Sequence, residues 1–145
     1  MPELDAHEVF FNLWQGSVPH TGSMLHNLGF DVLVLCAQEY QPPSNQFDGL
    51  QVIHAPNDDN FERRPSRAEL MVAIDAAKEV AHSIASGLKV LVTCMAGRNR
   101  SGLVSAIAIH RLTQKPGVEC IELIQSKRPH ALRNPQFNWV LRNIL

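Results

Sequence analysis

The chain has 145 residues, of which 45% are hydrophobic and 19% charged, a composition typical of a globular domain of ordinary size. The formal net charge of −1 excludes a protein that binds nucleic acid or anionic membranes through overall basicity, so any anion must be bound locally. Three cysteines, at positions 36, 94 and 120, have no CxxC spacing. This odd count argues against a disulfide framework and favours a reducing compartment.

The sequence shows no targeting segment, membrane span, repeat or linker. Residues 1–5 are acidic and contain no apolar core segment, so they do not resemble a signal peptide. No apolar run approaches the length that spans a bilayer, and no repeat or linker divides the chain. We therefore expect one domain over residues 1–145, in the cytoplasm and without a membrane span. The sequence gives no indication of oligomeric state.

In chain order, short apolar runs alternate with helical patterns. Strands are predicted at residues 9–13, 31–36, 50–54 and 89–93. Helices are predicted at residues 22–28, between the capping box Ser66-x-x-Glu69 and Gly87, at 101–113, at 118–127 and after Asn134-Pro135. The alternation predicts an α/β fold, with a central, mainly parallel sheet flanked by helices on both faces. A ligand would then bind at the carboxyl ends of the strands.

The stretch from residue 90 to residue 102 carries the strongest chemical signal. A β-branched run ends at Cys94, a loop containing Gly97 follows, and Arg100 and Ser101 open a long helical pattern. Such a strand–loop–helix unit directs backbone N–H groups and the positive helix end toward one point, where a thiolate is stabilised. The planar guanidinium of an arginine can hold two oxygens of a tetrahedral anion. The pattern predicts a nucleophile facing an oxyanion site; a buried cysteine that merely ends a core strand is the plainer alternative.

The same residues resemble the dual-specificity branch of the protein tyrosine phosphatase superfamily, and the resemblance covers nearly the whole chain. The matching segments are residues 13–17, 27–35 and 94–101, Arg128-Pro129, Asn134-Pro135 and Phe137. One departure lies at Thr93, where the family usually has histidine directly before the cysteine. Thr93 is expected either to support the Cys94 thiolate less than histidine would, or to be an ordinary strand residue without a catalytic role.

The resemblance implies a cysteine-dependent phosphatase fold that hydrolyses phosphate monoesters without metal or cofactor. Cys94 would attack phosphorus and form a phosphocysteine, and Ser101 would assist the departing thiolate. The Arg100 guanidinium and the backbone N–H groups of residues 95–100 would bind the transferred phosphoryl group. The phosphate-binding positions are Met95, Ala96, Gly97, Arg98, Asn99 and Arg100. The side chain of Arg98 has two interpretations, a pocket rim that attracts a second phosphate or an exposed surface residue.

An aspartate well upstream would supply the proton that the leaving group needs. The stretch 54–60 contains two candidates, Asp58 and Asp59. In the family the acid usually stands three residues beyond the position of Pro56, which favours Asp59, while adjacency leaves Asp58 open. The other carboxylate would be a solvated loop charge. No His or Cys spacing typical of metal sites is present, and we predict no metal.

The expected partner is a phosphorylated protein, carrying phosphotyrosine and/or phosphoserine or phosphothreonine, or another phosphoester. Alternatives in the same superfamily are an RNA 5′-triphosphatase and a phosphoinositide phosphatase. The lack of a basic excess gives no strong nucleic-acid signature. A phosphate-binding pseudophosphatase module and sulfur-transfer or arsenate chemistry are alternatives of other classes. Cys36 and Cys120 are predicted to be core residues, either of which would be able to pair with an oxidised Cys94.

Overall fold

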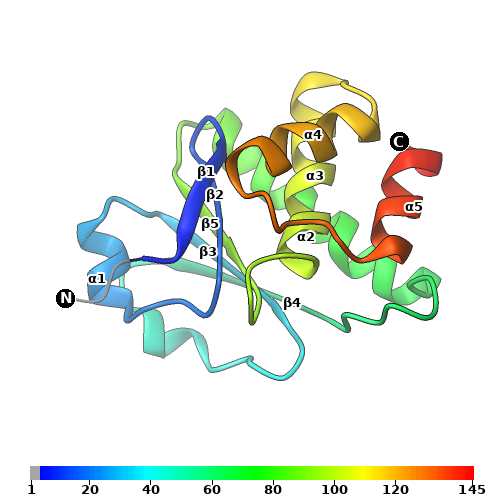
Figure 1. The fold of residues 1–145 in the computed structure, drawn as a ribbon. Coiled ribbons are helices and arrows are strands. Elements are labelled where there is room, and N and C mark those ends of the chain that lie inside the picture. The colour runs from blue at the N-terminus through cyan, green and yellow to red at the C-terminus, as the bar shows by residue number, and fades with distance from the viewer. Residues whose placement is uncertain (1–3) are drawn as a thin grey trace.

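The computed structural model describes residues 4–145 and contains one five-stranded sheet (Figure 1). Its strands are β1 (Ala6–Phe10), β2 (Leu13–Gly16), β3 (Val32–Ala37), β4 (Gln51–Asn57) and β5 (Val90–Thr93). They lie in the order β1-β2-β5-β3-β4. The pair β1–β2 is antiparallel and every other neighbouring pair is parallel. The predicted mainly parallel sheet is confirmed.

Helices cover both faces of this sheet, as predicted. They are α1 (Gly22–Asn27), α2 (Arg67–Ala85), α3 (Arg100–Thr113), α4 (Gly117–Lys127) and α5 (Pro135–Ile144), with a short 3₁₀ helix η1 (Ser44–Phe47). Successive side chains of a strand point to opposite faces, so the fully buried β3 contributes to two cores. The larger core packs Val32, Val34 and Cys36 against α2, α3, α4 and α5. The smaller core packs Leu33, Leu35 and Leu91 against Leu25, Phe30 and Phe47, which come from α1, η1 and the loops beside them.

The expectation of one strand over residues 9–13 is wrong. The chain turns there, and β1 and β2 form a hairpin in which Phe10 pairs with Leu13. Asn12 adopts a left-handed conformation with φ 59°, and its N–H donates to Glu8 Oε2 at 3.1 Å. Asparagine tolerates this conformation better than most residues, and it is the signal for a turn that the apolar run concealed.

The parallel strands bring their carboxyl ends to one edge of the sheet. Glu39 follows β3, Asp58 and Asp59 follow β4, and Cys94 follows β5. Since β3 lies between β4 and β5, these groups from distant parts of the sequence meet at the same edge. Within residues 4–145, no helix is both long and apolar enough to cross a membrane.

Candidate active site

Cys94 is the first residue after β5 and begins a loop, residues 94–100, that leads into α3; we call it the cysteine loop. Only 5% of the Cys94 surface is exposed, and its N–H donates to Gly16 O at 3.3 Å. Its thiol donates to Ser101 Oγ, with 3.2 Å between the two atoms. Ser101 lies in the first turn of α3 and is fully buried. The thiol and the hydroxyl are therefore fixed against each other at the positive end of a 14-residue helix.

The carbonyl groups of the cysteine loop point away from the site because buried side chains behind the loop bind them. Arg128 donates from Nε to Gly97 O at 2.6 Å and from Nη2 to Ala96 O at 3.1 Å. Gln15 Nε2 donates to Gly97 O and Arg98 O, both at 3.2 Å. Within residues 4–145, the N–H groups of residues 95–99 have no hydrogen-bond acceptor. Such a ring of unpaired N–H groups is what an oxyanion requires.

Arg128 is itself held in place by an ion pair with the N-terminal strand region. Its Nη1 and Nη2 atoms donate to the two carboxylate oxygens of Asp5, each at 3.1 Å, and Nη1 lies 2.9 Å from His7 Nδ1. The hydrogen bond from Arg128 lowers the pKa of Asp5 below its usual value. The sequence pattern included Arg128 without giving it a role. Gln15 was missed because the predicted strand ended at residue 13, whereas the structure places Gln15 within β2 and buries its side chain completely.

Arg100 lies at the start of α3 with 6% of its surface exposed. Its Nη1 and Nη2 atoms bind Glu39 Oε1 and Oε2 at 2.5 and 3.0 Å, and Nη1 also donates to Asn57 O at 3.0 Å. The hydrogen bond from Arg100 lowers the pKa of Glu39 below its usual value. Arg100 Nε is buried and has no acceptor among the residues that the structure describes. A buried charged donor without a partner is costly, and a bound oxyanion would supply the missing acceptor.

Sequence reasoning missed Glu39. It is the second residue after β3 and half-exposed, and nothing in its immediate sequence distinguishes it from a loop carboxylate. The available signal was topological, because the carboxyl ends of neighbouring parallel strands meet.

The two candidate acids occupy different environments. Both oxygens of Asp59 accept hydrogen bonds from amides, Oδ2 from Asn99 Nδ2 at 3.0 Å and Oδ1 from Asn134 Nδ2 at 2.7 Å. The side chain of Asp58 is 41% exposed, and its nearest cation is Arg63 Nη2 at 4.0 Å. Asp59 therefore connects the segment after β4 to the cysteine loop and to the start of α5, whereas Asp58 keeps a less constrained carboxylate.

The hydroxyl of Thr93 does not bind Cys94. It is buried and donates to Val34 O on the neighbouring strand β3, at 2.9 Å. Thr93 thus closes a cross-strand hydrogen bond, which agrees with the interpretation as a strand residue.

Of the two other cysteines, Cys36 lies beside Cys94. Both line one small cavity behind the cysteine loop. Burial, and next the charge of Cys94, raise the pKa of the Cys36 thiol well above its usual value. Cys120 lies on α4, and its Sγ faces Lys115 O at 3.6 Å. Both are core residues, as predicted, and only Cys36 shares a cavity with Cys94.

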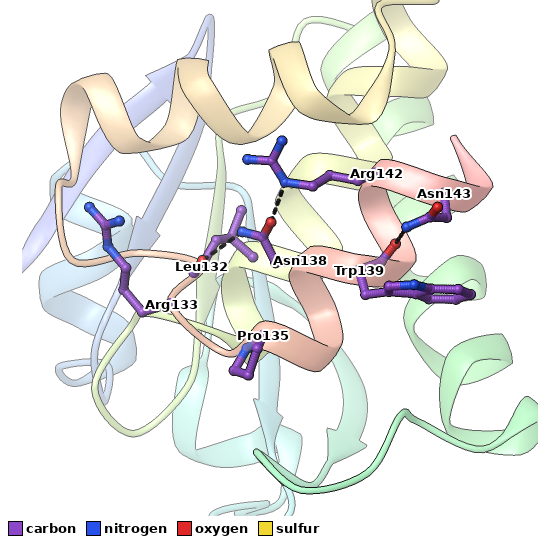
Figure 2. A pocket seen from close by; sticks show the side chains of 7 residues that line it. All are labelled: Leu132, Arg133, Pro135, Asn138, Trp139, Arg142 and Asn143. Carbon is purple, nitrogen blue, oxygen red and sulfur yellow. Dashed lines mark hydrogen bonds between the residues drawn. The ribbon is translucent and has the colours of Figure 1, made fainter.

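Away from the cysteine loop, a hollow lies along α5 (Figure 2). It has a volume of about 430 Å³, and no residue of the cysteine loop lines it. We call it the α5 groove. Next to the cysteine loop lies a smaller hollow of about 170 Å³, which Arg98, His130 and Arg128 help to line. Arg98 is exposed, and its side chain has no partner within residues 4–145.

A mainly parallel sheet that brings a buried cysteine, an arginine and a loop with N–H groups unpaired within residues 4–145 to one edge is the arrangement of cysteine-based phosphatases. The family model described as dual specificity phosphatase, catalytic domain, matches residues 13–144, and the chain belongs to this family. A comparison with curated protein sequences finds no match.

Solved structures with the same fold include several phosphatases. Tk-PTP in the active form is 22% identical, with a TM-score of 0.79 over 97% of this chain and 95% of that chain. Human DUSP28 is 23% identical, with a TM-score of 0.79 over 99% and 93% of the two chains. PTPMT1 in complex with PI(5)P is 21% identical, with a TM-score of 0.78 over 95% and 92%. The predicted family and fold class are thereby confirmed.

Proposed function

We propose that the chain hydrolyses phosphate monoesters on protein side chains, phosphotyrosine and/or phosphoserine and phosphothreonine, through a phosphocysteine intermediate on Cys94. The observation that carries the proposal is the ring of N–H groups around a buried thiol, completed by the unpaired Nε of Arg100. All of these donors are fixed by the surrounding protein. Preorganised donors of this kind stabilise charge that develops in a transition state at no cost in reorganisation.

In the first step, the Cys94 thiolate attacks phosphorus. The S–P bond forms while the bond to the leaving oxygen breaks, and the N–H groups of residues 95–100 bind the equatorial oxygens. Arg100 Nε binds one of these oxygens, while Glu39 keeps the other edge of the guanidinium occupied. The charge of the transferred group is thus matched by a guanidinium whose orientation is set in advance.

The leaving oxygen takes a proton from an aspartate, and the hydrogen bonds support Asp58 in this role. A general acid must release and recover a proton, and Asp59 would have to give up an amide donor to do so. The less constrained Asp58 carboxyl has no such restriction. Asp59 then acts as a positioning residue that fastens the segment carrying Asp58 to the cysteine loop. The family spacing favours Asp59, and the two assignments predict different dependences of the rate on the leaving group.

In the second step, water attacks phosphorus and the S–P bond breaks. Asp58, now a carboxylate, takes the proton from this water. The Ser101 hydroxyl, 3.2 Å from Sγ, donates to the departing thiolate and stabilises its charge.

The decisive experiment is turnover of para-nitrophenyl phosphate by the protein and by Cys94→Ser. We expect turnover that the substitution abolishes, and recovery of a phosphocysteine from acid-quenched Cys94 protein. A well-folded protein without turnover would instead support the pseudophosphatase alternative.

Phosphoinositide hydrolysis is the second candidate, because a protein of the same fold, PTPMT1, has been crystallised with PI(5)P. Initial rates on phosphotyrosine, phosphothreonine and phosphoinositide substrates at equal concentration separate the two candidates.

A further inference from the structure

The α5 groove combines an aromatic side chain with arginines. Figure 2 shows Arg133 and Trp139 at opposite sides of it, with Asn138 and Arg142 between them. The groove is lined by Leu132, Arg133, Pro135, Asn138, Trp139, Arg142 and Asn143. Two of the seven are cations and none is an anion. Its volume of about 430 Å³ is within the range of ligand-binding hollows.

The cations of the groove are held in place but not neutralised. Arg133 donates from Nε and Nη2 to Pro129 O, and Arg142 donates from Nε to Asn138 Oδ1. Each guanidinium therefore has an anchor and keeps free N–H groups. Within residues 4–145, no carboxylate lies within ion-pair distance of Arg64, Arg133 or Arg142. Preorganised, unpaired guanidiniums favour carboxylate partners.

Two partly exposed aromatic residues are associated with α5. Trp139 is 38% exposed, and the guanidinium of Arg64 lies 3.5 Å above the centroid of its ring system. Phe61 is 49% exposed, and its carbonyl accepts from Gln136 Nε2 of α5 at 3.2 Å. Partly exposed tryptophan beside arginine is typical of residues that dominate protein interfaces. Because the whole chain has a net charge of −1, the concentration of cations here is local.

Two residues that line the groove also contact the cysteine loop directly. The backbone N–H groups of Leu132 and Arg133 donate to Arg98 O and Asn99 Oδ1 of the cysteine loop, at 3.0 and 2.9 Å. The next residue, Asn134, donates to Asp59 at 2.7 Å. The groove is therefore fixed against the cysteine loop and the segment that carries Asp59.

We infer that the α5 groove binds an acidic segment of the phosphoprotein substrate, with its carboxylates on Arg133 and Arg142 and an apolar side chain on Trp139. This inference rests on the proposed function for the identity of the occupant as substrate. Charge complementarity at such a surface raises the encounter rate and adds affinity that salt screens.

The test compares phosphotyrosine peptides that share one core and carry an acidic, a neutral or a basic extension. We expect the acidic extension to lower KM about tenfold relative to the neutral one, as two exposed ion pairs and an aromatic contact provide. The double variant R133A/R142A removes this advantage, as does W139A, and higher salt diminishes it. Arg111→Ala, which removes an exposed arginine of α3 outside the groove, retains it.

Direct binding keeps this inference separate from the proposed chemistry. A fluorescein-labelled, unphosphorylated peptide of Asp and Glu with one Leu is titrated by anisotropy against the protein and each variant. We expect binding that R133A/R142A weakens, whether or not para-nitrophenyl phosphate is turned over. Equal KM for all extensions, binding unaffected by R133A/R142A, or tighter binding of a single-stranded RNA oligomer than of the acidic peptide would each overturn the assignment.

Discussion

Glu39 and Arg100 form a two-bond pair across the edge of the sheet, with Nη1–Oε1 and Nη2–Oε2 distances of 2.5 and 3.0 Å. The carboxylate occupies the two terminal nitrogens of the guanidinium and leaves Nε, which is buried and unpaired. Glu39 therefore fixes the plane of the guanidinium and leaves Nε available as a donor. The pair connects the end of β3 to the start of α3, segments 61 residues apart in sequence.

Substitution of Glu39 by Gln tests this positioning role. The amide keeps one acceptor but loses the charge and the second bond, so the guanidinium is free to tilt. We expect kcat for para-nitrophenyl phosphate to fall about 10- to 100-fold, the effect of a small displacement of a binding group. KM stays equal or falls, because the uncompensated arginine attracts the phosphate more strongly. An unchanged kcat would show that the pair has no part in positioning.

The assignment of Asp58 and Asp59 is tested by the leaving group. A general acid matters most when the leaving oxygen is basic. We therefore expect Asp58→Asn to lower kcat about 10²–10⁴-fold for phenyl phosphate and much less for para-nitrophenyl phosphate. Asp59→Asn, which disturbs the position of the segment, should lower both rates by similar factors. Steady-state kinetics on the two substrates gives the comparison.

The opposite result would identify Asp59 as the general acid, as the family spacing favours. If Asp59→Asn shows the strong leaving-group dependence and Asp58→Asn does not, Asp59 is the acid and its amide bonds break during turnover. A further variant is Asn134→Ala, which removes one donor to Asp59 and no carboxylate, but also removes the side-chain cap of α5 and a bond to Asn60 O, so its Tm is measured beside its activity. As for Asp59→Asn, we expect its rates on phenyl phosphate and para-nitrophenyl phosphate to fall by similar factors.

Oxidation of Cys94 should be resolved by Cys36. Peroxide converts the Cys94 thiolate to a sulfenic acid; the Cys36 sulfur then attacks the oxidised sulfur, an S–S bond forms and water leaves. We expect a loss of two hydrogens in intact mass and recovery of activity with a reducing agent. Burial raises the pKa of Cys36, so the step should accelerate at high pH.

Two variants separate the partners of this reaction. Cys36→Ser should lose the reversible product and accumulate irreversibly oxidised Cys94. Cys120→Ser should behave like the unsubstituted protein, because Cys120 lies on α4 and does not line the cavity behind the cysteine loop. Reversible protection in Cys36→Ser would contradict the pairing.

The start of α2 gives a pH-dependent contribution to stability. The hydrogen bond from Arg63, and next the N–H of Ser66, lower the pKa of Glu69 from 4.5 to about 2. A depressed folded-state pKa stabilises the protein at pH above the unfolded value of 4.5, and this stabilisation is lost as pH falls through 2. At pH 7 we expect Glu69→Gln to lower stability by about 0.5–1 kcal/mol, a Tm decrease of roughly 2–4 °C. Melting at pH 2 and below should show almost no difference between the two proteins.

The sequence predicted the parts of this molecule that depend on local pattern. The strand into Cys94, the capping box at Ser66 and the helix after Asn134-Pro135 each have neighbours in sequence that determine them. The order of the strands in the sheet determines which side chains meet at the site, and the hydrophobic periodicity of the sequence does not specify this order. The contacts of Gln15, Glu39 and Asp59 therefore could not be predicted. The family spacing favoured Asp59 over Asp58, whereas their different hydrogen bonds, which the sequence does not encode, lead us to propose Asp58.

Gly97 packs closely against the backbone of β2, and Gly87 provides a control. Both have positive φ, 66° at Gly97 and 86° at Gly87. A Cβ on Gly97 would lie 2.3 Å from Gly16 C, whereas one on Gly87 would meet nothing within 4 Å. Gly87→Ala should therefore cost only the left-handed strain, roughly 1–2 kcal/mol, and retain full activity. Gly97→Ala must in addition move β2 or the cysteine loop, so we expect a larger loss of stability and loss of turnover. Equal Tm values for the two variants would mean that the loop accommodates a side chain at position 97 and that its packing against Gly16 is not required.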